Sequence, residues 1–440
     1  MKSFLFVLQR LFPRKNPVFF YPDKIKTETL TSAKHKEAFM DYKNLSNEDA
    51  AKMLASCDWT CEGEKTVFLS HNLHPYPAKF IPQIPASAIE MFSEKGDTVW
   101  DIFGGSGTTA LEAMMRGRNC ISTDLNPVGY CIGMAKTAVL DKEDIKSLGN
   151  IMSELGVYES MPSEFTKWCN ENAAAISAET PAIPKLDKWF CKDAVNGLAF
   201  LKWYIKKQDV SDNVKNILTA AFSRTVNLAS NQEGETYYRA VEKTLSDGET
   251  VSMFLKSLRT NVRKINEMND ALPVQPVPSI RFAVMDVSEE MSDDDIKENS
   301  IDLIVTSPPY PKALDYCVYH RFRLFWLGYN PRLLRKREIG SHLNYQQKGN
   351  DPSVFEEEML PVMKNAHRAL KKGHFAVFVL GDAMYNGEIY NTAEKIGTLA
   401  EKEGFDIVWI GERPLPEHKR FNQIKKKRMV SERILVLRKR

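Results

Sequence analysis

Apolar and polar positions follow the order strand, turn, helix, strand in the region 66–139. Short apolar runs lie at 98–100 and 120–123, and a helix-like repeat at 109–116 separates them, just after a glycine-rich turn. This order is typical of the opening of a doubly wound α/β sheet, in which parallel strands alternate with covering helices. We therefore expect a sheet to begin here, with residues 1–65 as a peripheral segment before it.

The pattern changes between 140 and 275. Apolar residues now recur at helical spacing and strand-like runs nearly vanish, as in Val214, Ile217, Leu218, Ala221 and Phe222. The stretch 271–279 carries three prolines in nine residues, which is typical of a linker. The pattern predicts a helical insertion over 140–275 that interrupts the sheet.

Strand-like runs return in the region 276–440. A helix is expected at 353–371, ended by Gly373 in a C-terminal capping position. The expected strands are 280–285, 301–306, 375–380, 405–410 and 433–437. The last two are close in sequence, as in an antiparallel hairpin at a sheet edge. The fold predicted is α/β: a Rossmann-like, doubly wound and mostly parallel sheet with a C-terminal antiparallel hairpin and a helical insertion.

Composition changes this picture little. The 440 residues carry a net charge of +3, which permits a nucleic-acid partner without arguing for one. The apolar run within 4–12 is too short for a signal core, and no stretch reaches membrane-span length. Among seven scattered cysteines only Cys57 and Cys61 lie close together, without a second pair at zinc spacing. We expect a cytoplasmic protein with reduced thiols, no metal site and no membrane partner.

The stretch DIFGGSGTT, 101–109, places three glycines directly after the first strand. A glycine-rich turn there lets the backbone approach a ligand and offer N–H groups to it. Its spacing matches neither the dinucleotide fingerprint nor the phosphate-binding P-loop, which needs a lysine after the last glycine. Asp101 favours an ammonium group, and Asp124 stands where a ribose-binding acid is expected. S-adenosylmethionine satisfies both acids, although a purely structural turn with incidental acids would leave the same pattern.

A second motif, TSPPY, follows the apolar strand at 301–306. Its two prolines fix the backbone and leave nearby carbonyl groups without neighbouring N–H donors. The Ser307 hydroxyl and these carbonyl groups are then acceptors beside the ring of Tyr310. Acceptors next to an aromatic face suit a flat base with an exocyclic amine, on which stacking contributes about 1–3 kcal/mol. A proline turn that merely ends a strand is the structural alternative.

With these two motifs the chain resembles the amino-methylating, S-adenosylmethionine-dependent DNA methyltransferases. DIFGGSGTT is similar to their cofactor loop, with Gly105 where cysteine is common, and TSPPY is similar to their catalytic tetrapeptide. The leading serine of TSPPY is typical of cytosine-N4 enzymes, whereas adenine-N6 enzymes more often carry Asp or Asn. HPYPAKF, 74–80, resembles an upstream cofactor motif of the cytosine-N4 group. In this chain the cofactor motifs precede the catalytic motif, which is the less common order in that group.

The resemblance implies a role for each matching residue. Lys79 would contact the methionine carboxylate and Asp286 the adenine. The implied cofactor-binding residues are Lys79, Phe80, Asp101, Phe103, Gly104, Gly105, Ser106, Gly107, Thr108, Asp124 and Asp286. The implied catalytic residues are Ser307, Pro308, Pro309 and Tyr310.

The activity implied is transfer of a methyl group from S-adenosylmethionine to the N4 amine of a cytosine flipped out of duplex DNA. Such an enzyme would act in a restriction-modification or related defence system, with a cognate restriction endonuclease or defence-complex subunits as partners. Adenine-N6 methylation is the nearest alternative. Methylation of an RNA base amine and a non-catalytic DNA-binding subunit are the others.

Two basic loops near the catalytic motif, 331–337 and 418–428, are candidate contacts for DNA phosphates. Their candidate residues are Arg332, Arg335, Lys336, Arg337, Lys425, Lys426 and Lys427. We assign target recognition to the helical insertion together with the loop 311–350. The expected organisation is thus a peripheral segment (1–65), a cofactor-binding half (66–139), the insertion (140–275) and a catalytic half (276–440).

Overall fold

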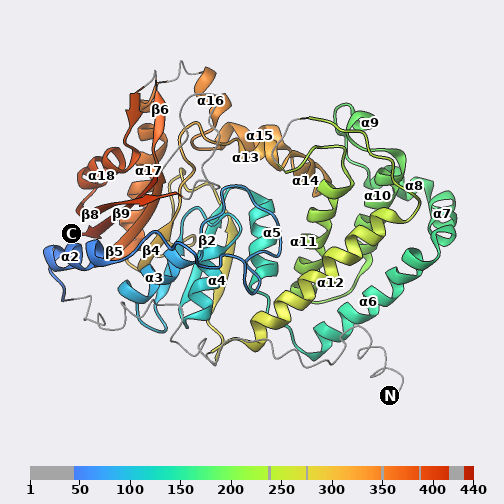
Figure 1. Ribbon diagram of the computed structural model, residues 1–440, viewed down its shortest axis with the longest axis horizontal. Coiled ribbons are helices and arrows are strands. Elements are labelled where there is room, and N and C mark those ends of the chain that lie inside the picture. The colour runs from blue at the N-terminus through green and yellow to red at the C-terminus, as the bar shows by residue number, and fades with distance from the viewer. Residues whose placement is uncertain (1–43, 236–238, 274–275, 348–350, 386–387, 416–430) are drawn as a thin grey trace. The chain divides into compact units, whose positions relative to one another are not determined.

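A seven-stranded sheet with the order β3-β2-β1-β4-β5-β9-β8 is the framework of the computed structural model (Figure 1). The structure describes residues 44–440 apart from 236–238, 274–275, 348–350, 386–387 and 416–430. The strands of this sheet are β1 (Thr98–Asp101), β2 (Asn119–Asp124), β3 (Ile280–Val284), β4 (Ile301–Thr306), β5 (Leu370–Gly381), β8 (Phe405–Pro414) and β9 (Ser431–Lys439). A separate two-stranded hairpin joins β6 (Ala383–Tyr385) to β7 (Glu388–Tyr390).

Strands β1 to β5 are parallel to their neighbours, whereas β9 is antiparallel to both β5 and β8. Strand β9 therefore lies between β5 and the edge strand β8. Each of the seven strands predicted from the sequence is present, and the predicted α/β fold class with its C-terminal antiparallel hairpin is confirmed. The chain order reverses between β1 and β4, which is where α/β sheets of this kind bind ligands.

Helices cover both faces of the sheet. On one face α2 (Asn47–Ser56), α3 (Gln83–Phe92) and α4 (Thr108–Met115) pack against side chains such as Val305 and Val377. On the other face α17 (Ser353–Ala369) and α18 (Thr392–Lys402) pack against alternate side chains of the same strands, such as Ile304 and Phe378. Strand β4 is buried along its whole length, as expected for a central strand covered on both faces.

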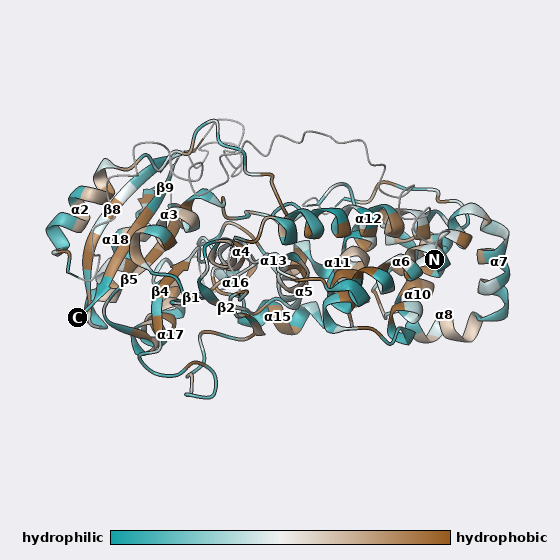
Figure 2. Cartoon of the chain, turned by 90° about the horizontal axis from the view of Figure 1, so that it is seen from below, coloured by the Kyte–Doolittle hydropathy of each residue, from teal (hydrophilic) through white to brown (hydrophobic). Residues whose placement is uncertain are grey.

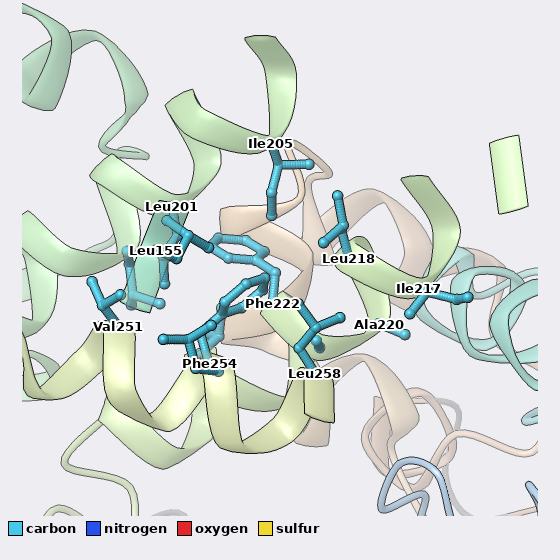
Figure 3. Packing of buried hydrophobic residues seen from close by; sticks show 14 of the residues in the cluster. Leu155, Leu201, Ile205, Ile217, Leu218, Ala220, Phe222, Val251, Phe254 and Leu258 are labelled. Carbon is cyan, nitrogen blue, oxygen red and sulfur yellow. The ribbon is translucent and has the colours of Figure 1, made fainter. Parts of the chain in front are cut away.

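The insertion forms a helical layer of its own beside the sheet (Figure 1). Its helices are α6 (Lys142–Ser160), α7 (Pro162–Glu171), α8 (Ala173–Glu179), α9 (Leu186–Trp189), α10 (Lys192–Lys207), α11 (Asp212–Ala229) and α12 (Glu249–Asp270). Figure 3 shows Leu155, Leu201, Phe222, Phe254 and Leu258 pointing toward one another between these helices. In Figure 2 strands β4 and β5 are mostly brown, whereas helices such as α12 carry both brown and teal residues.

The insertion and the sheet share a core. The cluster in Figure 3 continues to Leu111 and Met114 of α4 and to Phe322 and Trp326. Helix α5 (Pro127–Lys136), which follows β2, also packs against α11. Residues 41–440 accordingly form one compact unit.

Three local predictions are corrected by the structure. Helix α17 ends at Ala369, and Gly373 lies inside β5 at a φ of 77°, so it does not cap the helix. The basic segment 331–337 is not a loop but the short helix α15 (Pro331–Arg337), begun by the Asn330 side chain, which accepts from the N–H of Arg332. The described part of 311–350 is mostly helical as well, with α13 (Tyr316–Tyr319), α14 (Arg321–Trp326) and α16 (His342–Gln347).

The cysteines that the structure describes form no disulfide bonds with one another. No group of three or more His, Cys, Asp or Glu side chains gathers into a metal-binding arrangement among the described residues. None of the described helices is long and apolar enough to cross a membrane.

Candidate active site

A pocket opens at the carboxyl ends of β1, β2, β3 and β4, where the order of the sheet reverses. It encloses about 980 Å³ of space between atoms, open solvent at its mouth included, which is in the usual range for a small-molecule site. The sequence-predicted residues that line it are Lys79, Phe80, Asp101, Phe103, Gly104, Gly105, Ser106, Thr108, Asp124, Asp286, Ser307, Pro309 and Arg337.

The other predicted residues do not line this pocket. Gly107 is the N-cap of α4, and Pro308 is buried. Tyr310, Arg332, Arg335 and Lys336 also lie outside the lining. Lys425, Lys426 and Lys427 fall outside the residues that the structure describes.

The glycines of the loop are required mainly by the protein's own packing. A Cβ atom added to Gly104 would lie 2.0 Å from the Ser122 Oγ atom of β2, and one on Gly107 would lie 3.0 Å from Gly133 of α5. Gly107 also adopts a φ of 73°, which favours glycine. The loop therefore lies close to β2 and α5.

The loop N–H groups do not follow the sequence-based expectation. The N–H of Gly104 donates to the Thr123 carbonyl group, that of Gly105 to the Asp124 carboxylate, and that of Gly107 to the Gly104 carbonyl group. These three donors are consequently used inside the chain rather than offered to a ligand. The side chains of Ser106 and Thr108 line the pocket from the same loop.

Asp101 ends β1 at the floor of the pocket and is 2% exposed. The Thr306 hydroxyl donates to its Oδ1 atom over 2.8 Å, and the N–H of Phe103 donates to the same Thr306 hydroxyl. Burial raises the pKa of Asp101 to about 7, because the charged carboxylate has lost most of its water. A cation placed here would favour the ionised form, which agrees with the expected ammonium partner.

Asp124 ends β2 and organises the wall of the pocket. Its two carboxylate oxygens accept from the N–H groups of Gly105 and Asn126, each over 2.7 Å. Burial raises the pKa of Asp124, and these two donors oppose that rise. Each oxygen keeps a second lone pair, so the carboxylate can still accept from hydroxyl groups of a ligand.

Asp286, just after β3, is already engaged. Its Oδ1 atom accepts from the N–H and the hydroxyl of Ser288, and its Oδ2 atom accepts from the Arg337 Nε atom over 2.7 Å. Arg337, expected to bind DNA phosphate, is thus turned toward the pocket and pairs with this acid. Only part of the acceptor capacity of Asp286 remains for a ligand.

The TSPPY motif is tied by side-chain hydrogen bonds to β5 and β9. The Ser307 hydroxyl donates to the Val379 carbonyl group of β5 over 3.2 Å and also lies within hydrogen-bonding reach of Tyr310. A hydroxyl oxygen has two lone pairs, so it can still accept from a ligand. The Tyr310 hydroxyl donates to the Glu432 Oε1 atom of β9 over 2.9 Å. Glu432 in turn pairs with Arg413, whose side chain is 3% exposed.

Burial raises the pKa of Tyr310 well above its usual value, and the Glu432 carboxylate adds to that rise. The phenol therefore remains a neutral donor, and its hydrogen bond to Glu432 holds the ring in one orientation.

Several pocket residues were not singled out from the sequence. Tyr76 lies inside the HPYPAKF motif, and its ring stacks on Tyr316 with centroids 6.0 Å apart. Glu338 follows α15, and its carboxylate accepts from the N–H groups of Tyr316 and Cys317, the first two residues of α13. Burial raises the pKa of Glu338 to about 7. No local pattern marks Glu338, because its partners lie about twenty residues away in the chain.

Of the basic residues proposed for DNA contact, Arg332 and Lys336 are exposed on α15. Helix α15 contributes Leu334 and Arg337 to the pocket rim. The exposed cations therefore lie on an element that borders the pocket.

A family model described as DNA methylase, of the N6/N4 group, matches residues 4–132. The match includes the HPYPAKF motif, the glycine loop and Asp124, and it ends before the TSPPY motif.

The chain is also similar to two type II methyltransferases. It is 28% identical over 263 residues to M.MvaI of Kocuria varians, covering 58% of this chain and 56% of that protein. It is 23% identical over 297 residues to M.BsoBI of Geobacillus stearothermophilus, covering 60% and 54%. The chain thus spans about half the length of these curated relatives.

Among solved structures, an S-adenosylmethionine-dependent methyltransferase from Methanosarcina mazei aligns with a TM-score of 0.30 and 11% identity, over 83% of this chain and 98% of that one. The sequence comparisons thus show a match of residues 4–132 to the N6/N4 DNA methylase family model and a distant similarity of the chain to type II methyltransferases.

Proposed function

Starting from this relationship to N6/N4 DNA methylases, we propose that the protein transfers a methyl group from S-adenosylmethionine to the N4 amine of a cytosine flipped out of duplex DNA. The observation that carries the proposal is that Ser307 and Pro309 line the same pocket as the glycine loop. A donor seated on the loop and an amine held by the TSPPY motif would then share one cavity, as direct transfer requires.

The residues of the pocket fit the cofactor. Asp101 offers a buried carboxylate to the ammonium group, Lys79 a cation to the carboxylate, and Asp124 acceptors to the ribose hydroxyls. Ile102, Phe103 and Val287 supply the apolar surface that an adenine ring needs. When bound, the cofactor supplies a methyl group activated by its sulfonium.

The chain's own contribution to the reaction is positioning and electrostatic stabilisation. Ser307 donates to Val379, so its oxygen accepts a hydrogen of the base amine, together with carbonyl groups of the proline turn. These acceptors stabilise the positive charge that develops on the amine nitrogen. The Tyr310 ring stacks on the flipped base, and such contacts offset an unpairing cost of a few kcal/mol.

Cytosine rather than adenine is proposed because Ser leads the motif, the form typical of cytosine-N4 enzymes in the family that the sequence resembles. Cys317 lines the pocket, yet burial raises the pKa of its thiol, which disfavours the nucleophilic thiolate. A transfer without a covalent enzyme intermediate agrees with this chemistry.

The substrate is proposed to be duplex DNA, with Arg332 and Lys336 contacting phosphates near the pocket. We assign recognition of the target sequence to the helical insertion 140–275. In the same proposal, 1–65 is a peripheral segment, 66–139 the cofactor-binding half and 276–440 the catalytic half. We also propose a place in a restriction-modification or related defence system, beside a cognate endonuclease or defence-complex subunits.

The experiment that tests the proposal compares Ser307→Ala with the wild-type protein in transfer of tritiated methyl groups to unmethylated duplex DNA. We expect the variant to lose about a hundredfold in transfer rate while its affinity for the cofactor is unchanged. Ser292→Ala is the matched control, because Ser292 is exposed and lies outside the pocket lining. Undiminished transfer by Ser307→Ala would contradict the proposed role of the TSPPY motif in methyl transfer.

A further inference from the structure

Lys136 is a buried cation directly beneath the glycine loop. It is the last residue of α5, its exposed fraction is 0%, and its Nζ atom donates to the Ser106 Oγ atom over 3.3 Å. In the part of the chain that the structure describes, no carboxylate lies within ion-pairing distance of this ammonium group. The carboxyl end of α5 offsets the charge only in part. Burying a cation in this way is unfavourable unless something else compensates it.

The acid nearest to Lys136 is committed elsewhere. Glu112 of α4 accepts from the His71 Nε2 atom over 2.5 Å with one oxygen and pairs with Arg116 through the other. Burial alone would raise the pKa of Glu112, but Arg116 and His71 hold it below its usual value. Burial also lowers the pKa of His71 to about 4, so the imidazole is neutral and adds no charge.

A second cation, Lys79, lies on the same side of the pocket. Its Nζ atom donates to the His71 carbonyl group over 2.6 Å, and the Ser70 hydroxyl donates to the carbonyl group of Lys136 itself. Residues 70 and 71 therefore contact both lysines, Lys79 through its ammonium group and Lys136 through its backbone carbonyl group. Burial lowers the pKa of Lys79 to about 8. Burial, and then repulsion from Lys79, lowers the pKa of Lys136 below its usual value, while Glu112 opposes that change.

The hydrogen bond from Lys136 determines in which direction the Ser106 hydroxyl can donate. A hydroxyl has a single hydrogen, and its oxygen already accepts from the lysine. The hydrogen is then available to a group in the pocket, which Ser106 lines together with Lys79. Among the described residues neither lysine forms an ion pair, and Glu112, which acts on Lys136 from a distance, is paired with Arg116. Two cations and a directed hydroxyl donor in this arrangement form a site for an anion.

We propose that Lys136 is a positioning residue that directs the Ser106 hydroxyl, together with Lys79, onto the carboxylate of the cofactor's amino-acid tail. The inference rests on the proposed function for the identity of that cofactor. It adds that a lysine outside the pocket lining, on α5, selects ligands that carry the carboxylate. In the free protein Lys136 has no paired acid among the described residues, and the carboxylate of the bound ligand would provide the nearby negative charge.

The test compares two ligands that differ in the amino-acid tail. S-adenosylhomocysteine carries the carboxylate and 5′-methylthioadenosine lacks the tail, and calorimetry gives the affinity of each. In Lys136→Met we expect the affinity for S-adenosylhomocysteine to fall about ten- to a hundredfold, as for loss of hydrogen bonding to a charged group. The affinity for 5′-methylthioadenosine should change less than about twofold, within the scatter of indirect effects.

The stability of the ligand-free protein provides an independent readout. Because Lys136→Met removes a buried charge without an acid partner, the variant should melt at the same temperature as the wild type or higher. Lys264→Met is the matched control. Lys264 is also buried and donates to Asn72 in the same upstream segment, but it lies outside the pocket lining. That control should melt lower and leave the ratio of the two affinities unchanged.

If Lys136→Met leaves the ratio of the two affinities unchanged, whether or not both affinities fall, the proposal is overturned. If Lys136→Met does not fold, Ser106→Ala carries the same test, because it removes the directed hydroxyl and keeps the lysine. Failure of the wild-type protein to bind either adenosine compound would instead contradict the proposed cofactor, which separates the two claims.

Discussion

Replacing Tyr310 by phenylalanine separates the two contributions that this side chain can make to methyl transfer. The ring can stack on a flipped base, and the hydroxyl fixes the ring through its 2.9 Å hydrogen bond to Glu432. Tyr310→Phe keeps the ring and removes only the hydrogen bond. The Glu432 carboxylate keeps its ion pair with Arg413, so no buried charge is left without a partner.

The size of the effect follows from this geometry. A hydrogen bond to a charged group contributes about 1.5–3 kcal/mol. The Glu432 side chain is 17% exposed, so water replaces part of the lost bond. We expect unfolding of Tyr310→Phe to require about 1–2 kcal/mol less than that of the wild type. If the same energy orients the ring for reaction, the transfer rate falls about five- to thirtyfold, since 1.4 kcal/mol corresponds to a factor of ten.

The assay is single-turnover transfer of a tritiated methyl group to unmethylated duplex DNA, with cofactor affinity measured in parallel. Tyr310→Ala, which also loses the stacking surface, should be slower than Tyr310→Phe by a further factor that corresponds to about 1–3 kcal/mol. Cofactor affinity should be the same in all three proteins. A Tyr310→Phe protein as fast as the wild type, beside a slow Tyr310→Ala, would refute the positioning role of the Glu432 hydrogen bond.

Three further predictions concern the loop, the pH response and DNA. Gly104→Ala should lower the free energy of unfolding by about 1–3 kcal/mol through its clash with Ser122, and Ser122→Ala should restore part of the loss in thermal melting. Cofactor affinity should peak between pH 7 and 8 in calorimetry, because Asp101 ionises as pH rises through about 7 and Lys79 loses its proton above about 8; a flat profile would contradict both assignments. Lys336→Ala should weaken DNA binding and reduce the steepness of log affinity against log salt concentration by about 1. An unchanged slope would show that Lys336 does not contact a DNA phosphate.

The fold was accessible from the sequence because its strands are short apolar runs with clear ends. Burial on both faces gives β4 the apolar run 303–305, and α12 keeps its apolar stripe along the whole helix. Local ends were harder to predict. Gly373 resembles a helix cap in sequence, yet the chain is already extended at Leu370, where β5 begins its pairing with β4.

The candidate site was predictable where its residues follow strands within one motif. Asp101, Asp124 and Ser307 each stand at a strand end, and the parallel sheet brings these ends together. Partners from distant elements left no such pattern. The contact of Tyr310 with Glu432 depends on β9 pairing with β5, and that of Lys136 with Ser106 depends on α5 packing beneath the loop.

The direct test of the central claim is nucleoside mass spectrometry of DNA and RNA from cells that express the protein. The account predicts N4-methylcytosine in DNA from cells with the wild-type protein and none with Ser307→Ala. N6-methyladenine without N4-methylcytosine would contradict the proposed base, and methylated nucleosides confined to RNA would contradict the proposed substrate. DNA and RNA without any new methylated nucleoside would contradict the proposed methyl transfer itself.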